Sequence, residues 1–121
     1  MAQGNYLLVS RNDTLVQVMD HVVGSRLGCL STAQDSDEAS RFLESARCEA
    51  VFVDATQVAS CQPIRSRWHG PIVLLVSTEA KSATLHGYQN GADLAIPLPC
   101  DFRELVARVQ ALTRRSLMRP S

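Results

Sequence analysis

The sequence predicts an α/β fold in which one five-stranded parallel sheet carries helices on both faces, as in a doubly wound (βα)5 domain. Five short apolar, β-branched segments alternate with longer segments of helical spacing, and this alternation is typical of parallel sheets. The chain has 121 residues, which suffices for one domain with one core. Its composition, 45% apolar and 20% charged, is that of a globular domain rather than a disordered segment.

The chain opens with a predicted strand at residues 6–9, followed by a helix capped by Asn12 or Asp13. The apolar stripe of this helix consists of Leu15, Val16, Met19, Val22 and Val23. Residues 28–32 then form a weak strand, which we expect at an edge of the sheet.

The second helix and the third strand follow. The helix spans residues 36–46, and residues 50–53 form a continuous apolar run that ends at Asp54. A run of this kind suits a strand that is covered on both faces. We therefore expect it near the middle of the sheet.

Residues 55–69 are the least clear part of the chain, because Pro63 interrupts any long helix. The clearest strand follows at residues 71–76, and residues 77–90 have the pattern of a helix. The connection between the third and fourth strands therefore stays open.

The last strand is predicted at residues 93–96, closed by Pro97 and Pro99. Asp101 caps a final helix, and residues 114–121 are basic and lack periodicity, as in a linker or a frayed end. The apolar stripe of the final helix consists of Leu105, Val106, Val109 and Leu112.

Charge and cysteine content exclude several classes of protein. Twelve basic side chains balance twelve acidic ones, so no net charge draws the chain to nucleic acid or to an anionic membrane. The sequence has no membrane-spanning segment and no leader, which predicts a cytoplasmic protein. The cysteines are too far apart for a metal site, so we expect reduced thiols that pack in the core; they are Cys29, Cys48, Cys61 and Cys100. The sequence contains no nucleophile–base pair and no glycine-rich phosphate loop, the motifs that would indicate an enzyme.

A functional site in such a sheet belongs beyond the carboxyl ends of the strands. The polar and apolar residues at those ends are Ser10, Arg11, Asp54, Val76, Ser77, Pro97 and Leu98. The function of the chain depends on what these side chains can do together.

The C-terminal third of the chain resembles the end of a bacterial response-regulator receiver domain. Residues 91–93 (Gly-Ala-Asp) and 99–108 (Pro-Cys-Asp-Phe-Arg-Glu-Leu-Val-Ala-Arg) resemble the pattern G-A-D-D-Y-x-x-K-P-F-x-x-x-E-L-x-x-R, which is common in that family. Asp54 and the strand beginning at Pro71 also fall where a receiver has them. The resemblance is loose between residues 55 and 70.

The resemblance covers about residues 5–115 and implies a flavodoxin-like receiver fold. We therefore expect one receiver-like domain at residues 1–115 and a basic linker or frayed tail at residues 116–121. The tail would lead into a DNA-binding domain that this chain does not contain.

The resemblance also implies a degenerate active site. Receivers accept a phosphoryl group on the aspartate that Asp54 matches, and they hold Mg²⁺ with an acid pair, which here is Ser10 and Arg11. The remaining positions, a hydroxyl, a lysine and an aromatic residue, are here Val76 (or Ser77 one residue on), Leu98 and Ala95. We expect a pseudo-receiver that binds no Mg²⁺ and is not phosphorylated by the usual route.

Two arrangements of Arg11 are open. Its guanidinium can occupy the place of the metal and pair with Asp54, or it can point to solvent while Asp54 caps the next loop. The second arrangement is favoured.

The resemblance also implies a surface for dimerisation, which does not depend on the degenerate active site. In winged-helix regulators of the OmpR/PhoB type, the fourth helix, fifth strand and fifth helix form a symmetric interface with reciprocal ion pairs. The resemblance places interface positions at Asp93, Leu94, Glu104, Arg108 and Arg114. The ionic set is incomplete, because Thr84 replaces a basic residue and Leu94 an acidic one. Glu104 and Arg108 are also i and i+4, so they can pair within their own helix instead.

The function that these observations favour is a phosphorylation-independent receiver and dimerisation domain of an atypical response regulator, which controls transcription through a missing effector. Alternatives are a stand-alone pseudo-receiver that recruits a partner, a receiver gated by a metabolite, and an active receiver with a rearranged metal site.

Overall fold

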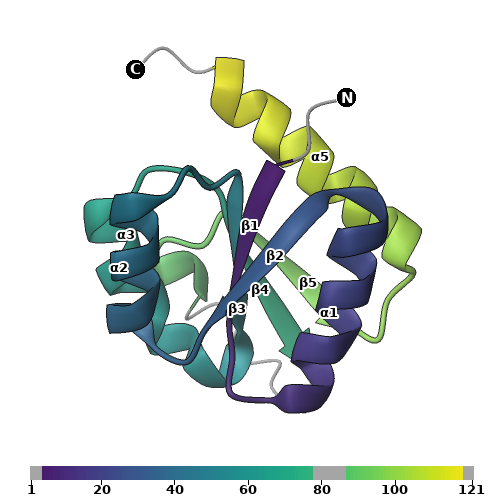
Figure 1. Ribbon diagram of the computed structural model, residues 1–121, viewed down its shortest axis with the longest axis horizontal. Helices are drawn as coiled ribbons and strands as arrows, with labels where there is room; N and C mark the ends of the chain where they lie inside the picture. Colours follow the sequence, from purple (N-terminus) through teal and green to yellow (C-terminus); the bar gives the residue numbers. More distant parts are fainter. Residues whose placement is uncertain (1–3, 78–86, 119–121) are drawn as a thin grey trace.

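The computed structural model describes residues 4–77 and 87–118 and has a single five-stranded sheet (Figure 1). The strands are β1 (Gly4–Val9), β2 (Gly28–Ala33), β3 (Ala50–Asp54), β4 (Ile72–Ser77) and β5 (Leu94–Leu98). Every pair of neighbouring strands is parallel, and the order across the sheet is β2-β1-β3-β4-β5. The predicted fold class is confirmed, as is the edge position of the second strand.

The helices cover both faces of this sheet (Figure 1). They are α1 (Asp13–Arg26), α2 (Ser36–Ser45), the 3-10 helix η1 (Ala55–Ser60), α3 (Cys61–Arg67) and α5 (Phe102–Met118). Helices α1 and α5 lie on one face, and α2 and α3 lie on the other. Most of the helix predicted at residues 77–90 lies outside the described residues, although residues 87–89 are helical and Ser77 belongs to β4.

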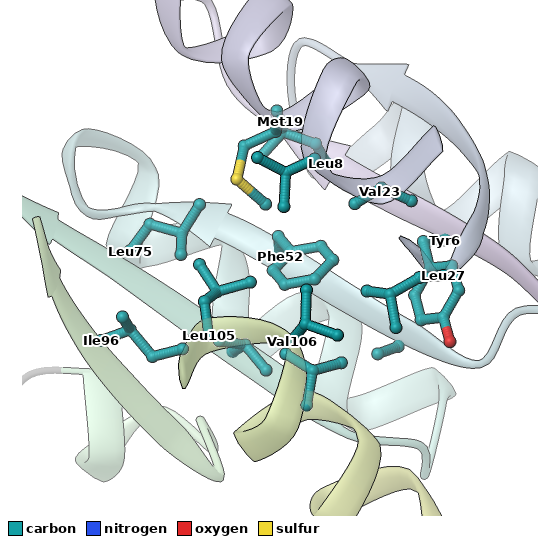
Figure 2. Packing of buried hydrophobic residues seen from close by; sticks show 14 residues of the cluster. Tyr6, Leu8, Met19, Val23, Leu27, Phe52, Leu75, Ile96, Leu105 and Val106 are labelled. Atoms are coloured by element: carbon teal, nitrogen blue, oxygen red, sulfur yellow. The ribbon is translucent and has the colours of Figure 1, made fainter. Parts of the chain in front are cut away.

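Two apolar clusters form the core, because alternate strand residues point to opposite faces. Phe52 of β3 lies at the centre of the cluster under α1 and α5, between Met19 and Leu105 (Figure 2). On the other face, Val53 and Ile64 belong to the cluster under α2 and α3. Both faces of β3 are therefore buried, as its continuous apolar sequence predicts.

Helix α1 begins where the sequence predicts. The side chain of Asn12 accepts hydrogen bonds from the N–H groups of Thr14 and Leu15, at 3.0 and 3.2 Å. These bonds satisfy two of the amides that a helix N-terminus leaves without partners. Asn12, rather than Asp13, is the cap.

The structure resolves the unclear segment after β3 into η1 and α3. Asp54 caps η1 by accepting a hydrogen bond from the N–H of Thr56, and the helical path bends at Gln57 (φ −111°, ψ 26°). Pro63 does not cause this bend, since it lies in the first turn of α3. Backbone nitrogens in the first turn of a helix donate no intrahelical hydrogen bond, so proline is tolerated there.

The C-terminal part of the chain differs from the prediction in two places. Strand β5 continues through Pro97 to Leu98, which is possible because an edge strand needs no N–H on its outer side. Helix α5 continues to Met118, so the expectation of a linker beginning near residue 114 is wrong for residues 114–118. Arginine, serine, leucine and methionine all tolerate a helix, and the next helix breaker is Pro120.

The four cysteines are free thiols, as expected, but they differ in burial. Cys61 is buried, and Cys48 and Cys100 pack partly against the two clusters. Burial raises the pKa of Cys48 to about 12 and that of Cys61 to about 11, so both stay protonated at neutral pH. The core-packing expectation is wrong for Cys29, which is exposed on the edge strand β2.

Candidate functional site

The carboxyl ends of β1 and β3 bring Ser10 and Asp54 together. The register of these neighbouring strands pairs Val9 with Val53, so the next residue of each strand lies at the same level of the sheet. The Ser10 hydroxyl donates a 2.9 Å hydrogen bond to Oδ2 of Asp54. Both residues are buried, with exposed fractions of 3% and 8%.

Neutral donors satisfy the Asp54 carboxylate. Its Oδ1 accepts from the N–H of Thr56 at 3.2 Å, and the Ser10 hydroxyl in turn accepts from the N–H of Asn12 at 3.0 Å. This chain of hydrogen bonds joins the start of α1 to the end of β3. A buried carboxylate needs such partners, because burial without them costs several kcal/mol.

Arg11 does not pair with Asp54. Its side chain is exposed, and its Nε donates a 3.2 Å hydrogen bond to the carbonyl of Gln34, in the turn after β2. Strand β1 ends at Val9 and the chain bends at Arg11, which directs this side chain toward Gln34 and away from the carboxylate that Ser10 meets. The favoured arrangement, with Arg11 toward solvent and Asp54 as a cap, is confirmed, and the paired arrangement is wrong.

The other strand-end positions are mostly apolar. Val76 is buried in the cluster under α2 and α3, while Ser77 is exposed at the end of β4. On β5, Leu98 packs partly against the cluster under α1 and α5, and Ala95 packs against the opposite cluster. All four side chains are uncharged, so none of them places a charge next to the Asp54 carboxylate.

The sequence of this chain is similar to that of response regulators. Response regulator MprA of Mycolicibacterium vanbaalenii is 34% identical over 90 residues, which are 69% of this chain and 39% of that protein. Response regulator MprA of Mycobacterium sp. (strain KMS) is 33% identical over the same length. The chain therefore spans about two fifths of the curated relatives it matches. No protein-family model matches it.

Solved structures decide the fold. The receiver domain of the sensor histidine kinase PA1611 from Pseudomonas aeruginosa superimposes with a TM-score of 0.81 over 93% of this chain and 99% of that one, at 21% identity. A putative response regulator from Chloroflexus aurantiacus gives a TM-score of 0.83 over 94% of this chain and 100% of that one, at 23% identity. The chain has the fold of a response-regulator receiver domain. Asp54 accordingly stands where the resemblance places the phosphoacceptor.

The residues at the carboxyl ends of the strands do not fit a magnesium site. The PA1611 structure holds a magnesium ion coordinated in its active site cleft. Magnesium prefers several oxygen ligands in octahedral geometry, with carboxylates among them. Here the residues at the acid-pair positions are a hydroxyl, already bonded to Asp54, and an arginine. Within residues 4–77 and 87–118, no three His, Cys, Asp or Glu side chains gather around a common point.

Asp93, one of the expected interface residues, lies in a network of contacts within the domain. Its Oδ2 accepts from Nη2 of Arg65 and, at 2.9 Å, from the N–H of Ile72. Arg65 also donates to the carbonyls of Gly91, at 2.9 and 3.1 Å, and Gly70, at 2.8 Å. This network lies at the amino ends of β4 and β5, opposite to Asp54.

Sequence reasoning missed Arg65. Its contact with Asp93 joins residues 28 positions apart, and no local pattern marks it. A weak indication was available in Gly91, whose φ of +107° suits glycine and whose missing Cβ leaves room for Arg65: an added Cβ would lie 2.8 Å from its Cγ.

The expected interface residues on α5 are exposed. Glu104, Arg108 and Arg114 form no side-chain ion pair with one another in the part of the chain that the structure describes. The possible intrahelical ion pair between Glu104 and Arg108 is therefore not formed. Leu94 packs partly against the cluster under α1 and α5. Asp101 caps the helix as expected, and the hydrogen bond from the N–H of Arg103 lowers the pKa of its carboxyl.

No helix in the described part of the chain is both long enough and apolar enough to cross a bilayer.

Proposed function

We propose that this receiver domain is the regulatory and dimerisation domain of an atypical cytoplasmic response regulator that works without phosphorylation. The observation that carries the proposal is the buried hydrogen bond from Ser10 to Asp54. A carboxylate that accepts a phosphoryl group must present an oxygen lone pair to phosphorus. Here Oδ2 already accepts from the serine hydroxyl and Oδ1 from the amide of Thr56, and Asp54 is only 8% exposed, so the carboxylate is poorly accessible to a phosphodonor.

The described residues at the acid-pair and lysine positions also lack the charges that phosphoryl transfer requires. An anionic phosphoryl group approaches a carboxylate when a divalent cation neutralises both. Ser10 and Arg11 supply no carboxylate to hold that cation, and Leu98 supplies no ammonium group at the end of β5. The domain therefore acts as a signalling module with a fixed structure rather than as an enzyme or a phosphorylation switch.

Incubation with a small phosphodonor and Mg²⁺ tests this proposal. We expect the intact mass of the chain to stay unchanged and Mg²⁺ to leave its melting temperature unchanged. The matched control is the double variant Ser10→Asp/Arg11→Asp, which restores an acid pair and places at least one carboxylate next to Asp54, so Mg²⁺ should raise its melting temperature by relieving their repulsion. A gain of one phosphoryl group in the wild-type chain, absent in Asp54→Ala, would contradict the proposal.

Exposed charges on α5 support dimerisation. In an isologous dimer the same patch meets itself across a two-fold axis, so Glu104 of one copy can meet Arg108 or Arg114 of the other. These three side chains are exposed and not engaged with one another within the chain. Leu94 adds an apolar contact to this face, while Asp93 contributes less than the resemblance implies because it binds Arg65.

Sedimentation equilibrium, without phosphodonor or metal, tests the dimer. We expect a dimer at micromolar concentration that Arg108→Glu weakens at least tenfold, a loss of about 1.4 kcal/mol or more. Arg41→Glu is the matched control, since Arg41 is exposed on α2, on the opposite face of the sheet, and should have no effect. A monomer would favour the second candidate, a stand-alone module that recruits another protein.

We propose that the regulated module is a DNA-binding effector domain that follows α5 in the full-length protein. The resemblance to OmpR/PhoB-type regulators supports it, together with the similarity to curated response regulators that are longer than the matched segment. A constitutive dimer would hold two effectors at the spacing of a repeated DNA site. Control would then come from protein abundance or from a bound metabolite.

A further inference from the structure

The outer edge of β5 carries a side-chain cap on its backbone. Among the described residues, strand β5 is the last strand of the sheet and has no neighbouring strand on its outer side. The N–H of Ala95 donates a 3.1 Å hydrogen bond to the hydroxyl of Tyr88. Tyr88 belongs to the helical residues 87–89 and is 46% exposed. Its side chain extends from this helix to β5, where the hydroxyl meets the Ala95 amide.

The next amide position on that edge is a proline. Residues i and i+2 of a strand direct their backbone groups to the same side, so the nitrogen of Pro97 faces outward as that of Ala95 does. Proline has no N–H to offer. Both outward amide positions in the middle of β5 are thus without a free donor: Tyr88 caps one and Pro97 removes the other.

The opposite edge of the sheet has no such protection. The carbonyl of Ala33 accepts from the N–H of Ser10, so Ala33 and Ser31 direct their backbone groups toward β1. Leu30 and Thr32 therefore direct theirs outward. Strand β2 contains no proline, and no described side chain bonds these two amides.

A short turn sets the position of Tyr88. The N–H of Ala92 donates to the carbonyl of Gly87 at 2.8 Å, and the N–H of Gly91 donates to the carbonyl of Tyr88 itself at 3.2 Å. The guanidinium of Arg65 donates hydrogen bonds to the carbonyl of Gly91 in the same turn. The phenol is therefore held next to β5 by the same turn that Arg65 anchors.

We propose that Tyr88 and Pro97 close the outer edge of β5 to pairing with another strand. An unprotected edge strand is a template for backbone pairing with a second chain, and such pairing needs free N–H donors. Any association on the β5 side of the domain then uses side chains rather than backbone. This inference concerns the isolated domain and does not depend on whether the proposed dimer forms.

Amide hydrogen exchange in the variant Tyr88→Phe tests the cap. Phenylalanine keeps the ring but lacks the accepting oxygen. We expect the Ala95 amide to exchange about two- to tenfold faster than in the wild type, the range that one hydrogen bond gives. The Asp93 amide, which donates to the carbonyl of Ile72, should keep its rate. No change at Ala95, or an equal change at both amides, would overturn the proposal.

The double variant Tyr88→Phe/Pro97→Ala tests the consequence. It restores two free outward donors on β5, so we expect concentration-dependent association in sedimentation velocity. Both the variant and its parent carry Arg108→Glu, which removes any dimer through α5 from the measurement. A double variant that stays as monomeric as its Arg108→Glu parent would overturn edge closure, whatever the wild-type chain does.

Discussion

Replacing Arg65 with alanine is expected to lower the free energy of unfolding by about 3 kcal/mol. One guanidinium joins Asp93 to the carbonyls of Gly91 and Gly70, and its side chain is only 27% exposed. Its loss leaves the Asp93 carboxylate with the amide of Ile72 as its remaining partner. Urea unfolding measures the change, with the slope m expected to stay constant.

The matched control for Arg65 is Arg67→Ala on the same helix. Arg67 is 69% exposed, and its ion pair with Glu44 is 3.8 Å long, so the variant should change stability by less than about 0.5 kcal/mol. Asp93→Ala should be destabilising too, and combining it with Arg65→Ala should cost less than the sum of the two. Equal, small effects of Arg65→Ala and Arg67→Ala would contradict a structural role for the network.

Replacing Ser10 with alanine is expected to lower the free energy of unfolding by about 2 kcal/mol. The variant leaves Oδ2 of Asp54 buried and without its donor, and it removes the acceptor for the N–H of Asn12. Asp54→Ala should also be destabilising, because it removes the cap of η1. The double variant should cost clearly less than the sum, since both changes remove the same hydrogen bond.

Arg11→Ala is the control for this pair. The Arg11 side chain is exposed and binds the carbonyl of Gln34, so its removal should cost less than about 0.5 kcal/mol and should not couple to Asp54→Ala. A coupling of more than about 1 kcal/mol between Arg11 and Asp54 would show that the guanidinium neutralises the carboxylate in solution.

The alternation of strands and helices made the fold predictable, because each apolar run is short and bounded by polar or glycine residues. The end of β3 at Asp54 and the cap at Asn12 were predictable for the same reason: each is a local pattern of a few residues. Local patterns did not reveal that Pro97 is tolerated within β5, which depends on that strand lying at the edge.

The contacts within the candidate site were less predictable. The sequence pointed to Ser10, Arg11 and Asp54 together, but which of the first two meets the carboxylate depends on the direction of one side chain where the chain leaves β1. The Arg65 network joins segments brought together only by the finished sheet. Tyr88 was missed for a related reason, since its hydroxyl bonds a strand residue that has no special sequence feature of its own.

The length of α5 limits how far anything attached to the domain can move. The helix has 17 residues and extends for about 25 Å, and its last turns reach past the amino end of β1 in Figure 1. A flexible tether starting at residue 114 would let an attached module sample a wide volume. Helix α5 instead carries the chain without a break to Met118. Two modules carried by a pair of such domains would thus have a smaller volume to explore, and a higher effective concentration for each other.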